Sequence, residues 1–284
     1  MRELTLKDMQ QKGLDILSDV HDFCVKHDIK YSLAYGSLIG AIRHKGFIPW
    51  DDDVDIIMPR PDYEKFCSSF SAPGRGLIRD TDKDSYILFS RVFDTEGTIC
   101  RTMNPFAKKY SGGVWIDIFP LDGVSDDFNS FSETIRSLKL LWQRQIRYRY
   151  ADASVKEILQ TFPIKDILIL FALKITGTSG WFLKKNNRKM RQLASRFKYG
   201  ETGHWSQLTV LDDSTRNYQT MDLFRDTIDV AFEDKCFKAL SGYDQYLRNI
   251  YGDYMQLPPE KDRKPKQHRL KFYWKYNIQP YRPL

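Results

Sequence analysis

Cysteine and long apolar runs are both scarce in this sequence. Its 284 residues include four cysteines, which are scattered and lack the spacing of metal-binding cysteines. This density speaks against a disulfide framework and indicates a reducing compartment. The most apolar stretch, 162–183, is interrupted by Lys165, Asp166 and Lys174, so it falls short of the roughly 18 uninterrupted apolar residues of a membrane span. Because the N-terminal residues are also polar and charged, unlike a secretion signal, we expect a chain that does not cross a membrane.

Internal repeats, low-complexity tracts and an excess of acidic residues are missing as well. The net charge is instead +7 and the pI is near 9.0. A basic surface suits anionic partners such as nucleotides, phosphosugars, nucleic acid or lipid headgroups, and it does not choose among them. A basic soluble protein without any polyanion partner has the same composition.

Hydrophobic periodicity and turn residues predict strands and helices mixed along the first part of the chain. Thr5 and Asp8 form an acidic capping box that opens a helix ending near Lys26, and Pro61 stands where a proline opens a helix. The expected strands are 30–34, 54–58, 87–93, 114–118 and 228–232, and the expected helices are 6–26, 37–44, 62–70 and 243–250. This mixture predicts an α+β (mixed α/β) fold, with a mixed sheet flanked by helices. The strand-poor stretch 133–198 predicts a helical accessory region.

The densest cluster of charge is the acidic string at residues 51–55, which reads DDDVD. If Asp53 and Asp55 lie on one strand, their side chains point to the same face, because strand alternation has a period of two. Two carboxylates on one face repel each other unless a cation lies between them, and oxygen ligands of this kind suit Mg²⁺ or Mn²⁺. A solvated acidic turn is the plainer interpretation, but the interleaved Val54 and Ile56 favour a half-buried strand.

Two further features accompany this cluster. Gly36 and Ser37 end a strand and open a helix, where N–H groups and a hydroxyl can hold a phosphate, although most Gly-Ser pairs are ordinary turns. Asp117 lies in an apolar strand-like run, where a carboxylate is costly unless it binds metal or is capped or salt-bridged. A Gly-Ser turn, an Asp-x-Asp pair and a later Asp, in this order, resemble the nucleotidyltransferase superfold. That superfold gathers three carboxylates around one or two divalent ions, and the third carboxylate can also accept a hydroxyl proton.

A longer string narrows the resemblance. Residues 35–56 read YGSLIGAIRHKGFIPWDDDVDI, which resembles the signature of the LicD family of bacterial phosphocholine transferases, relatives of fukutin-type enzymes. WIDIFPLDG at 115–123, and YGDYM at 251–255 followed by LPP, fit the same family in the expected order. The resemblance covers about residues 10–268, is least diagnostic over 130–225, and shows no departure at the acidic positions.

The resemblance implies a metal-dependent enzyme, a transferase of phosphorus-containing groups. The implied donor is CDP-choline or another CDP-linked alcohol, such as CDP-ribitol or CDP-glycerol, and CMP is released. The implied acceptor is a sugar hydroxyl of a cell-surface or lipid-linked glycan: lipopolysaccharide, teichoic acid or capsule. The donor phosphate would contact Gly36 and Ser37. The expected ligands of Mg²⁺ or Mn²⁺ are Asp53, Asp55 and Asp117, with Asp51 joining them or holding a metal-bound water.

Basic and aromatic residues near these motifs are further candidates. Arg43, His44 and Lys45 could neutralise the donor pyrophosphate or stabilise the transferring charge, although basic residues also favour the end of a helix. Arg91, in the strand-like run FSRVF, is a candidate phosphate ligand. Trp50 could offer an aromatic face to choline, although aromatic residues beside a strand are usually core.

The resemblance also organises the chain. We expect a nucleotidyltransferase-like catalytic core at 1–125, a mainly helical accessory region at 126–225, and a C-terminal segment at 226–284 that packs back on the core. His268 in that last segment resembles a family position. Segment 162–183 is either a buried helix or a helix lying on a membrane surface. We therefore expect a cytoplasmic protein with at most peripheral membrane association, at the inner face of the cell membrane.

Two other functions remain open at this point. A nucleotidyltransferase acting on a small molecule would use the same metals but would release pyrophosphate from a nucleoside triphosphate. A basic nucleic-acid-binding or scaffold protein would lose polyanion affinity steeply with salt and would show no metal-dependent turnover. Because a groove for a polyanion would not be lined with aspartates, we expect no nucleic-acid partner.

Overall fold

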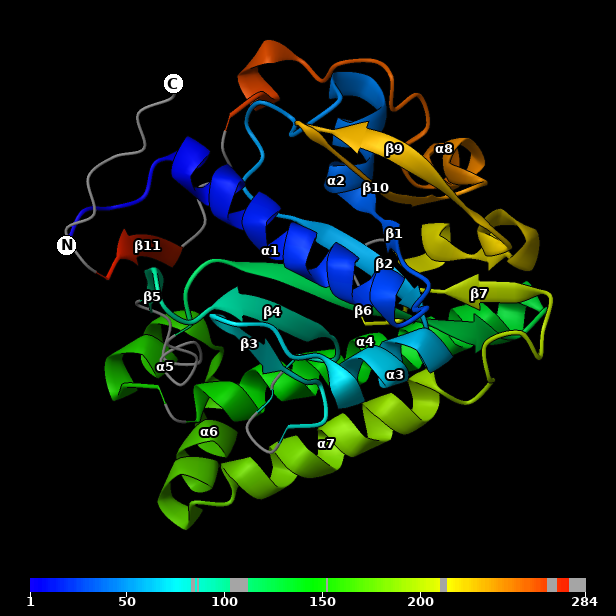
Figure 1. Cartoon of the computed structure of the whole chain (residues 1–284). Coiled ribbons are helices and arrows are strands. Elements are labelled where there is room, and N and C mark those ends of the chain that lie inside the picture. The colour runs from blue at the N-terminus through cyan, green and yellow to red at the C-terminus, as the bar shows by residue number, and fades with distance from the viewer. Residues whose placement is uncertain are drawn as a thin grey trace.

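Strands and helices mix through the first part of the chain, and helices dominate its middle (Figure 1). The computed structural model describes residues 1–82, 85, 87–102, 112–151, 153–209, 214–264 and 270–275. The α-helices are α1 (Leu6–Lys26), α2 (Tyr35–Ile39), α3 (Arg60–Ser69), α4 (Phe128–Tyr150), α5 (Val155–Thr161), α6 (Ile164–Thr176), α7 (Ser179–Ala194) and α8 (Tyr243–Tyr251). The strands are β1 (Ser32–Leu33), β2 (Asp55–Pro59), β3 (Arg75–Ile78), β4 (Ser90–Asp94), β5 (Thr98–Thr102), β6 (Trp115–Val124), β7 (His204–Ser206), β8 (Gln219–Thr220), β9 (Thr227–Phe232), β10 (Lys235–Leu240) and β11 (Leu270–Trp274).

One mixed sheet forms the centre of the molecule. Its main path runs β1-β2-β6-β4-β3, and β7 and β8 extend it beside the far half of β6. β2 and β6 are parallel, whereas the other pairs in this sheet are antiparallel. β9 and β10 form a separate hairpin, and β11 pairs with β5. The predicted α+β class, with a mixed sheet and flanking helices, is thus confirmed.

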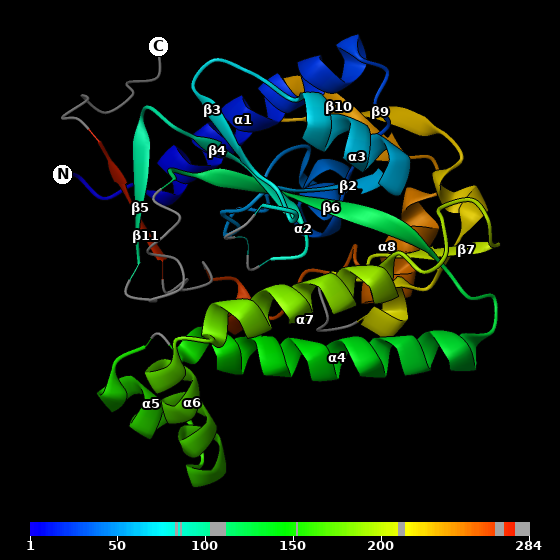
Figure 2. The ribbon, with the colours of Figure 1, turned by 90° about the horizontal axis from the view of Figure 1, so that it is seen from below.

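Helices cover both faces of this sheet. Figure 2 shows α1 and α3 on one side and α7, backed by α4, on the other. α1 packs against β4 and β6, and α3 packs against β2 and β6. The main hydrophobic cluster lies between α1, α3 and the sheet, and a second cluster joins α4 and α7 to Val124 of β6. The sheet is therefore held from both sides, which fixes the positions of the side chains that its strands carry.

The first helix follows its sequence signals closely. The Thr5 hydroxyl accepts a hydrogen bond from the Asp8 N–H at 3.2 Å, and the Asp8 carboxylate accepts one from the Thr5 N–H at 2.9 Å. This reciprocal box satisfies two N–H groups that a helix start leaves without intrahelical partners. Leu14, Leu17 and Val20 then fall on the buried face at helical spacing. The predicted helix 6–26 is confirmed at both ends.

Several element boundaries differ from the predictions. The expected helix 37–44 begins at Tyr35 and ends in a π-helical turn, η1 (Gly40–His44). The 3-10 turns are η2 (Ser214–Asn217), η3 (Met221–Phe224) and η4 (Glu260–Asp262). The strand expected at 87–93 begins at Ser90. β5, β10 and β11 were not predicted, because each is defined by pairing with a distant partner or hairpin mate and not by a strong local pattern.

The proposed division of the chain at 125 and 225 stays a prediction. Helices α4 to α7 do occupy most of 126–225, but β7 and β8 lie in the same stretch and pair on to the central sheet. In the C-terminal stretch, β11 pairs with β5 near the N-terminus, and Leu4 donates to the Phe272 carbonyl at 2.9 Å. His268 lies outside the described residues.

Candidate active site

Three charged residues form one row across the central strands. Asp55 at the start of β2 is the register partner of Asp117 in β6, and Asp117 is the register partner of Arg91 in β4. Neighbouring strands lie about 4.8 Å apart and register partners project to the same face, so the row reads carboxylate, carboxylate, guanidinium. The sequence placed all three residues at the site, but their side-by-side arrangement comes from the order of the strands.

The other aspartates lie in the loop that leads into β2. Asp51, Asp52 and Asp53 are half-buried, and one carboxylate oxygen from each lies within 4.8 Å of the others. The prediction that Asp53 and Asp55 share one strand is wrong, because β2 begins at Asp55. A strand would have turned Asp52 to the opposite face, whereas the loop lets three consecutive carboxylates converge. Asp52 was not among the predicted ligands for that reason.

Asp117 connects the row to this loop. Its Oδ1 accepts from Arg91 Nε at 2.6 Å, while its Oδ2 lies 3.5 Å from Arg91 Nη2. Burial raises the pKa of the Asp117 carboxyl, Arg91 opposes that rise, and the nearby negative charge of Asp53 adds to it. The salt-bridge interpretation of Asp117 therefore holds in part. The contact with Arg91 does not cancel the effects of burial and of Asp53, so the pKa of Asp117 stays above its ordinary value.

Arg91 itself is held between the carboxylate and aromatic rings. Its guanidinium carbon lies 4.5 Å from the centre of the Trp115 ring and 5.3 Å from that of Phe89. Stacking of this kind suits the planar guanidinium and limits its freedom. Its predicted role as a phosphate ligand stays a prediction, because the guanidinium contacts Asp117 here.

The Gly36–Ser37 turn packs against the acidic loop and the start of β2. The Ser37 hydroxyl is buried and accepts from the Asp55 N–H at 2.9 Å, which ties the start of α2 to the start of β2. A Cβ on Gly36 would collide with the Asp51 carboxylate, so glycine makes room for that side chain. Tyr35 adopts the left-handed region with φ 48°, a strained backbone for a bulky residue. The turn thus places the carboxylates, and its predicted contact with the donor phosphate remains untested.

The basic residues at the end of η1 make contacts away from the acidic loop. Arg43 donates to the Tyr254 carbonyl at 2.5 Å and, through Nε, to His44 Nε2 at 3.0 Å. Burial lowers the pKa of His44, and the charge of Arg43 lowers it further. Lys45 is exposed, and Trp50 is half-buried with its ring 6.5 Å from the His44 ring. Arg43 therefore also has a structural role, because it holds the segment that follows α8.

Glu233 was missed by sequence reasoning. It lies in the turn between β9 and β10, with a positive φ of 56°, and its carboxylate accepts from the Phe47 N–H at 2.8 Å. Its own N–H donates to the Lys45 carbonyl at 2.7 Å. These bonds clamp the glycine loop that precedes the acidic string. No local pattern could have found this contact, because 186 residues separate its partners.

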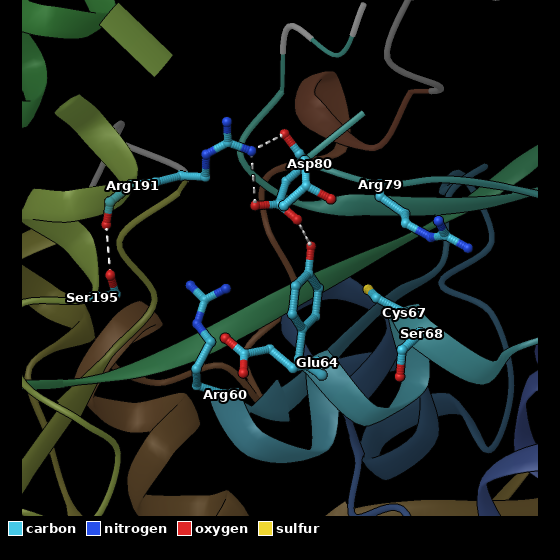
Figure 3. A pocket seen from close by; sticks show the side chains of 10 residues that line it. Arg60, Glu64, Cys67, Ser68, Arg79, Asp80, Arg191 and Ser195 are labelled. Carbon is cyan, nitrogen blue, oxygen red and sulfur yellow. Dashed lines mark hydrogen bonds and ion pairs between the residues drawn. The ribbon is translucent and has the colours of Figure 1, made fainter. Parts of the chain in front are cut away.

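A pocket of about 400 Å³ lies near the end of β2 that is away from the acidic loop. It is lined by side chains of α3, α7 and the segment after β3 (Figure 3). Arg60 binds Asp122 through two contacts of 2.7 and 2.6 Å. Arg191 donates to the Asp80 carbonyl at 2.6 Å, and the Tyr63 hydroxyl donates to the Asp80 carboxylate at 3.0 Å. These charges are largely paired with each other, so we interpret the pocket as a structural ion-pair network.

The donor set of the acidic end fits a hard divalent cation. Asp51, Asp52, Asp53, Asp55 and Asp117 offer carboxylate oxygens alone, the ligand type that Mg²⁺ and Mn²⁺ prefer. Their negative charge exceeds what Arg91 can neutralise. An α+β core with several carboxylates gathered at one end of its central strands is an arrangement that could hold a divalent cation beside a phosphorylated substrate.

Comparison with known proteins gives the family. The model described as "LicD/FKTN/FKRP, nucleotidyltransferase domain" matches residues 28–164. The chain is 32% identical over 273 residues to the lipopolysaccharide cholinephosphotransferase LicD of Haemophilus influenzae, which covers 93% of this chain and 97% of that protein. A shorter match, 41% over 66 residues, joins it to an uncharacterized protein of Rickettsia typhi, covering 19% of this chain and 21% of that protein.

This chain belongs to the LicD family. The resemblance that residues 35–56 carry is thereby confirmed, and so is the predicted enzyme class, a transferase of phosphorus-containing groups. Two of the three signature stretches, 35–56 and 115–123, fall inside the matched range and supply the acidic loop and the two carboxylates of the charged row.

Proposed function

We propose that this protein transfers phosphocholine from CDP-choline to a sugar hydroxyl of a cell-surface glycan and releases CMP, with a divalent cation as cofactor. The name of the Haemophilus relative supports phosphocholine as the cargo and lipopolysaccharide as the acceptor, and the match extends over nearly all of both chains. The observation that carries the proposal is the convergence of the acidic loop with Asp117 at one end of the sheet.

The cation, Mg²⁺ or Mn²⁺, would be held by Asp53, Asp55 and Asp117, with Asp51 or Asp52 completing the set. When bound, such an ion neutralises charge on the phosphates and on the oxygens that enter and leave phosphorus. The Gly36–Ser37 turn would orient the donor by keeping Asp51 and Asp55 in place.

The remaining steps fall to the chain's own groups. Asp117 Oδ2, which Arg91 holds less closely than Oδ1, would take the proton of the acceptor hydroxyl. Arg91 would keep that carboxylate oriented and add positive charge beside the transferring group. Arg43, His44 and Lys45 would meet the bridging oxygen of the donor pyrophosphate, which leaves with CMP. Trp50 offers a half-buried aromatic face for the quaternary ammonium.

The test is CMP release from a panel of CDP-choline, CDP-ribitol and CDP-glycerol, with Mg²⁺ or Mn²⁺ and a crude glycan acceptor. The wild type should release CMP from CDP-choline, and a double variant, Asp53→Ala with Asp55→Ala, should not. A matched double variant on the β9–β10 hairpin, Asp229→Ala with Asp234→Ala, should behave like the wild type, because both of those aspartates are exposed.

A different result would identify the neighbouring chemistry. Release of pyrophosphate from a nucleoside triphosphate, with no CMP from any CDP-alcohol, would replace this proposal with nucleotidyl transfer to a small molecule. CMP release from CDP-ribitol or CDP-glycerol alone would keep the reaction type and change the cargo.

A further inference from the structure

Helices α5 and α6 project from the body of the molecule. Figure 2 shows both of them beyond the long pair α4 and α7, at the end where β6 begins. Figure 1 places them at the same end of the sheet. They enclose a small hydrophobic cluster of their own, which includes Ile158, Leu170 and Leu173 and is separate from the clusters under the sheet. We call α5, α6 and the first three turns of α7 the helical tip.

Helix α6 carries an apolar face on each side. Its inner face is buried through Leu170 and Leu173. Its outer face exposes Ile164, Leu168 and Ile175, at 79%, 68% and 83% of their full area. These three positions follow one another at intervals of four and seven residues, so they form one stripe along the helix. A helix with apolar residues on two of its faces is normally covered on both, and this one has an outer stripe open to solvent.

Further exposed apolar residues lie on the same three helices, and together with the stripe we call them the patch. Val155 and Leu159 of α5 are exposed, as is Ile169 of α6, and Trp181 at the start of α7 is 57% exposed. Single exposed apolar residues are ordinary, but a contiguous group of large ones marks an interaction surface. A tryptophan at the border of such a group is typical of a membrane interface, where its ring faces lipid and its N–H faces water.

The helices that carry this patch are also rich in positive charge. Residues 155–191 contain eight lysines and arginines against two acidic residues, although the whole chain has a net charge of only +7. Exposed basic side chains occur on each of the three helices: Lys156, Lys165, Lys184, Lys185, Arg188 and Lys189. Lys185 lies over the Trp181 ring, 4.9 Å from its centre. Long basic side chains can rest their stems on apolar surface while their heads reach anionic groups.

We propose that the helical tip docks on the surface of an anionic lipid bilayer, with α6 lying in the interface. The apolar stripe would enter the acyl boundary, and the surrounding lysines and arginines would meet lipid phosphates. Among the described residues no single helix is long and apolar enough to cross a membrane; α6 and α7 pass that test as a pair, by length and composition, but are bent by 112°. Interfacial docking is the arrangement in which the folded tip keeps its inner cluster and covers its outer stripe.

Docking in this way would place the active end of the sheet near the bilayer. The tip and the start of β6, which carries Asp117, lie at the same end of the molecule (Figure 2). An acceptor glycan built on a lipid anchor would then be presented to the carboxylates without leaving the membrane surface. This step rests on the proposed transferase function, whereas the docking itself rests on the patch and its charge.

The experiment is co-sedimentation of the full chain with vesicles of phosphatidylcholine alone and of phosphatidylcholine with phosphatidylglycerol. The wild type should bind the anionic vesicles and should bind the neutral ones far less. Replacing the two most exposed residues of α6, Ile164→Ser with Ile175→Ser, should weaken binding roughly thirtyfold. The charge variant Lys184→Gln with Lys189→Gln should weaken it about tenfold on anionic vesicles only.

A matched variant, Val25→Ser with Ile228→Ser, removes two exposed apolar residues elsewhere on the surface and should bind like the wild type. Unchanged thermal unfolding of each variant shows that the fold is intact. Equal vesicle binding by the α6 variant, or no binding by the wild type, would overturn the proposal. Binding that survives high salt and alkaline carbonate would also overturn it, in favour of insertion of the bent pair.

The tip could instead cover itself with a second copy of the chain. Analytical ultracentrifugation separates the two cases: a dimer that the α6 variant dissociates, together with no vesicle binding, would replace the proposal. The readouts do not use catalysis. Failure of vesicle binding leaves the transferase proposal standing, and failure of CMP release leaves the docking surface standing.

Discussion

Charged side chains lie at both ends of the parallel strands β2 and β6, and the two ends are organised differently. At the far end, where both strands finish, Asp122 is fully buried and Arg60 donates to it through two hydrogen bonds of 2.6 and 2.7 Å. At the near end, where both strands begin, Arg91 makes one short contact with Asp117, and further carboxylates lie in the same region. One end joins a single carboxylate to a single guanidinium, and the other gathers several carboxylates close to one guanidinium.

We interpret the far end of these two strands as structural and the near end as a binding site. A buried carboxylate with its own guanidinium partner needs no further ligand, so the far end fastens α3 to the sheet. Carboxylates in excess repel each other and destabilise the fold, which is the usual condition of a site built to receive a cation or a substrate. The two ends should therefore respond in opposite ways when one acid is removed.

The largest effect is expected at the near end. Asp53→Asn should lower CMP release by about a thousandfold, because under the proposed function it removes one of the carboxylates that would hold the cation beside the transferring phosphate. The midpoint of thermal unfolding should stay the same or rise, since repulsion among the carboxylates is relieved. Activity assays and a melting curve on the same preparation check both parts. A fall in activity that merely tracks loss of folded protein would contradict the comparison.

At the far end, Asp122→Asn should act on stability. It leaves the guanidinium of Arg60, which is largely buried, without its charged partner, so the free energy of unfolding should fall by roughly 3–5 kcal/mol. The activity per folded molecule should remain within a few-fold of the wild type. Urea unfolding combined with activity measured well below the transition tests this. If catalysis fails while stability holds, the far end belongs to the active site after all.

A smaller effect is expected from the glycine below the acidic loop. Gly36→Ala places a Cβ against the Asp51 carboxylate, which must move. Activity should drop ten- to a hundredfold, as it does when a catalytic group is displaced by about 1 Å, with a change in stability of about 1 kcal/mol or less. Gly180→Ala in α7 is the control, because no atom lies within 4 Å of the added methyl group. Equal activity in the two variants would show that the position of Asp51 is unimportant.

The smallest effect concerns pH. The folded pKa of His44 is lowered by burial and by Arg43, so the unfolded chain binds the proton first as pH falls. The stabilising contribution of neutral His44 is therefore present above its unfolded pKa of about 6.5 and is lost progressively below that value. His44→Gln should flatten the decline of the melting temperature between neutral and mildly acidic pH. An identical decline in both proteins would assign it to other groups.

Local signals in the sequence predicted the local parts of the fold. Thr5 and Asp8 set the start of α1, and alternating apolar residues located β2 and β6. The motif strings also located the acidic residues, and the strand-like run FSRVF drew attention to Arg91. What the sequence could not provide is the strand order that sets Asp55, Asp117 and Arg91 in one row.

Contacts between distant residues account for the other differences. Arg43 meets the Tyr254 carbonyl across 211 residues, and Glu233 meets Phe47 across 186. Asp52 was overlooked because strand alternation was extended into a segment that is a loop. In each case tertiary packing decided which partner a polar group finds, and periodicity has no access to that choice.

The most direct test of the central claim is Mn²⁺ binding, followed by electron paramagnetic resonance of the free ion, in the wild type, Asp53→Asn and Asp122→Asn. The account predicts that the wild type and Asp122→Asn bind Mn²⁺ with the same affinity, and that Asp53→Asn binds it at least tenfold more weakly. Equal binding by all three proteins would show that the surplus of carboxylates at the near end is not a metal site.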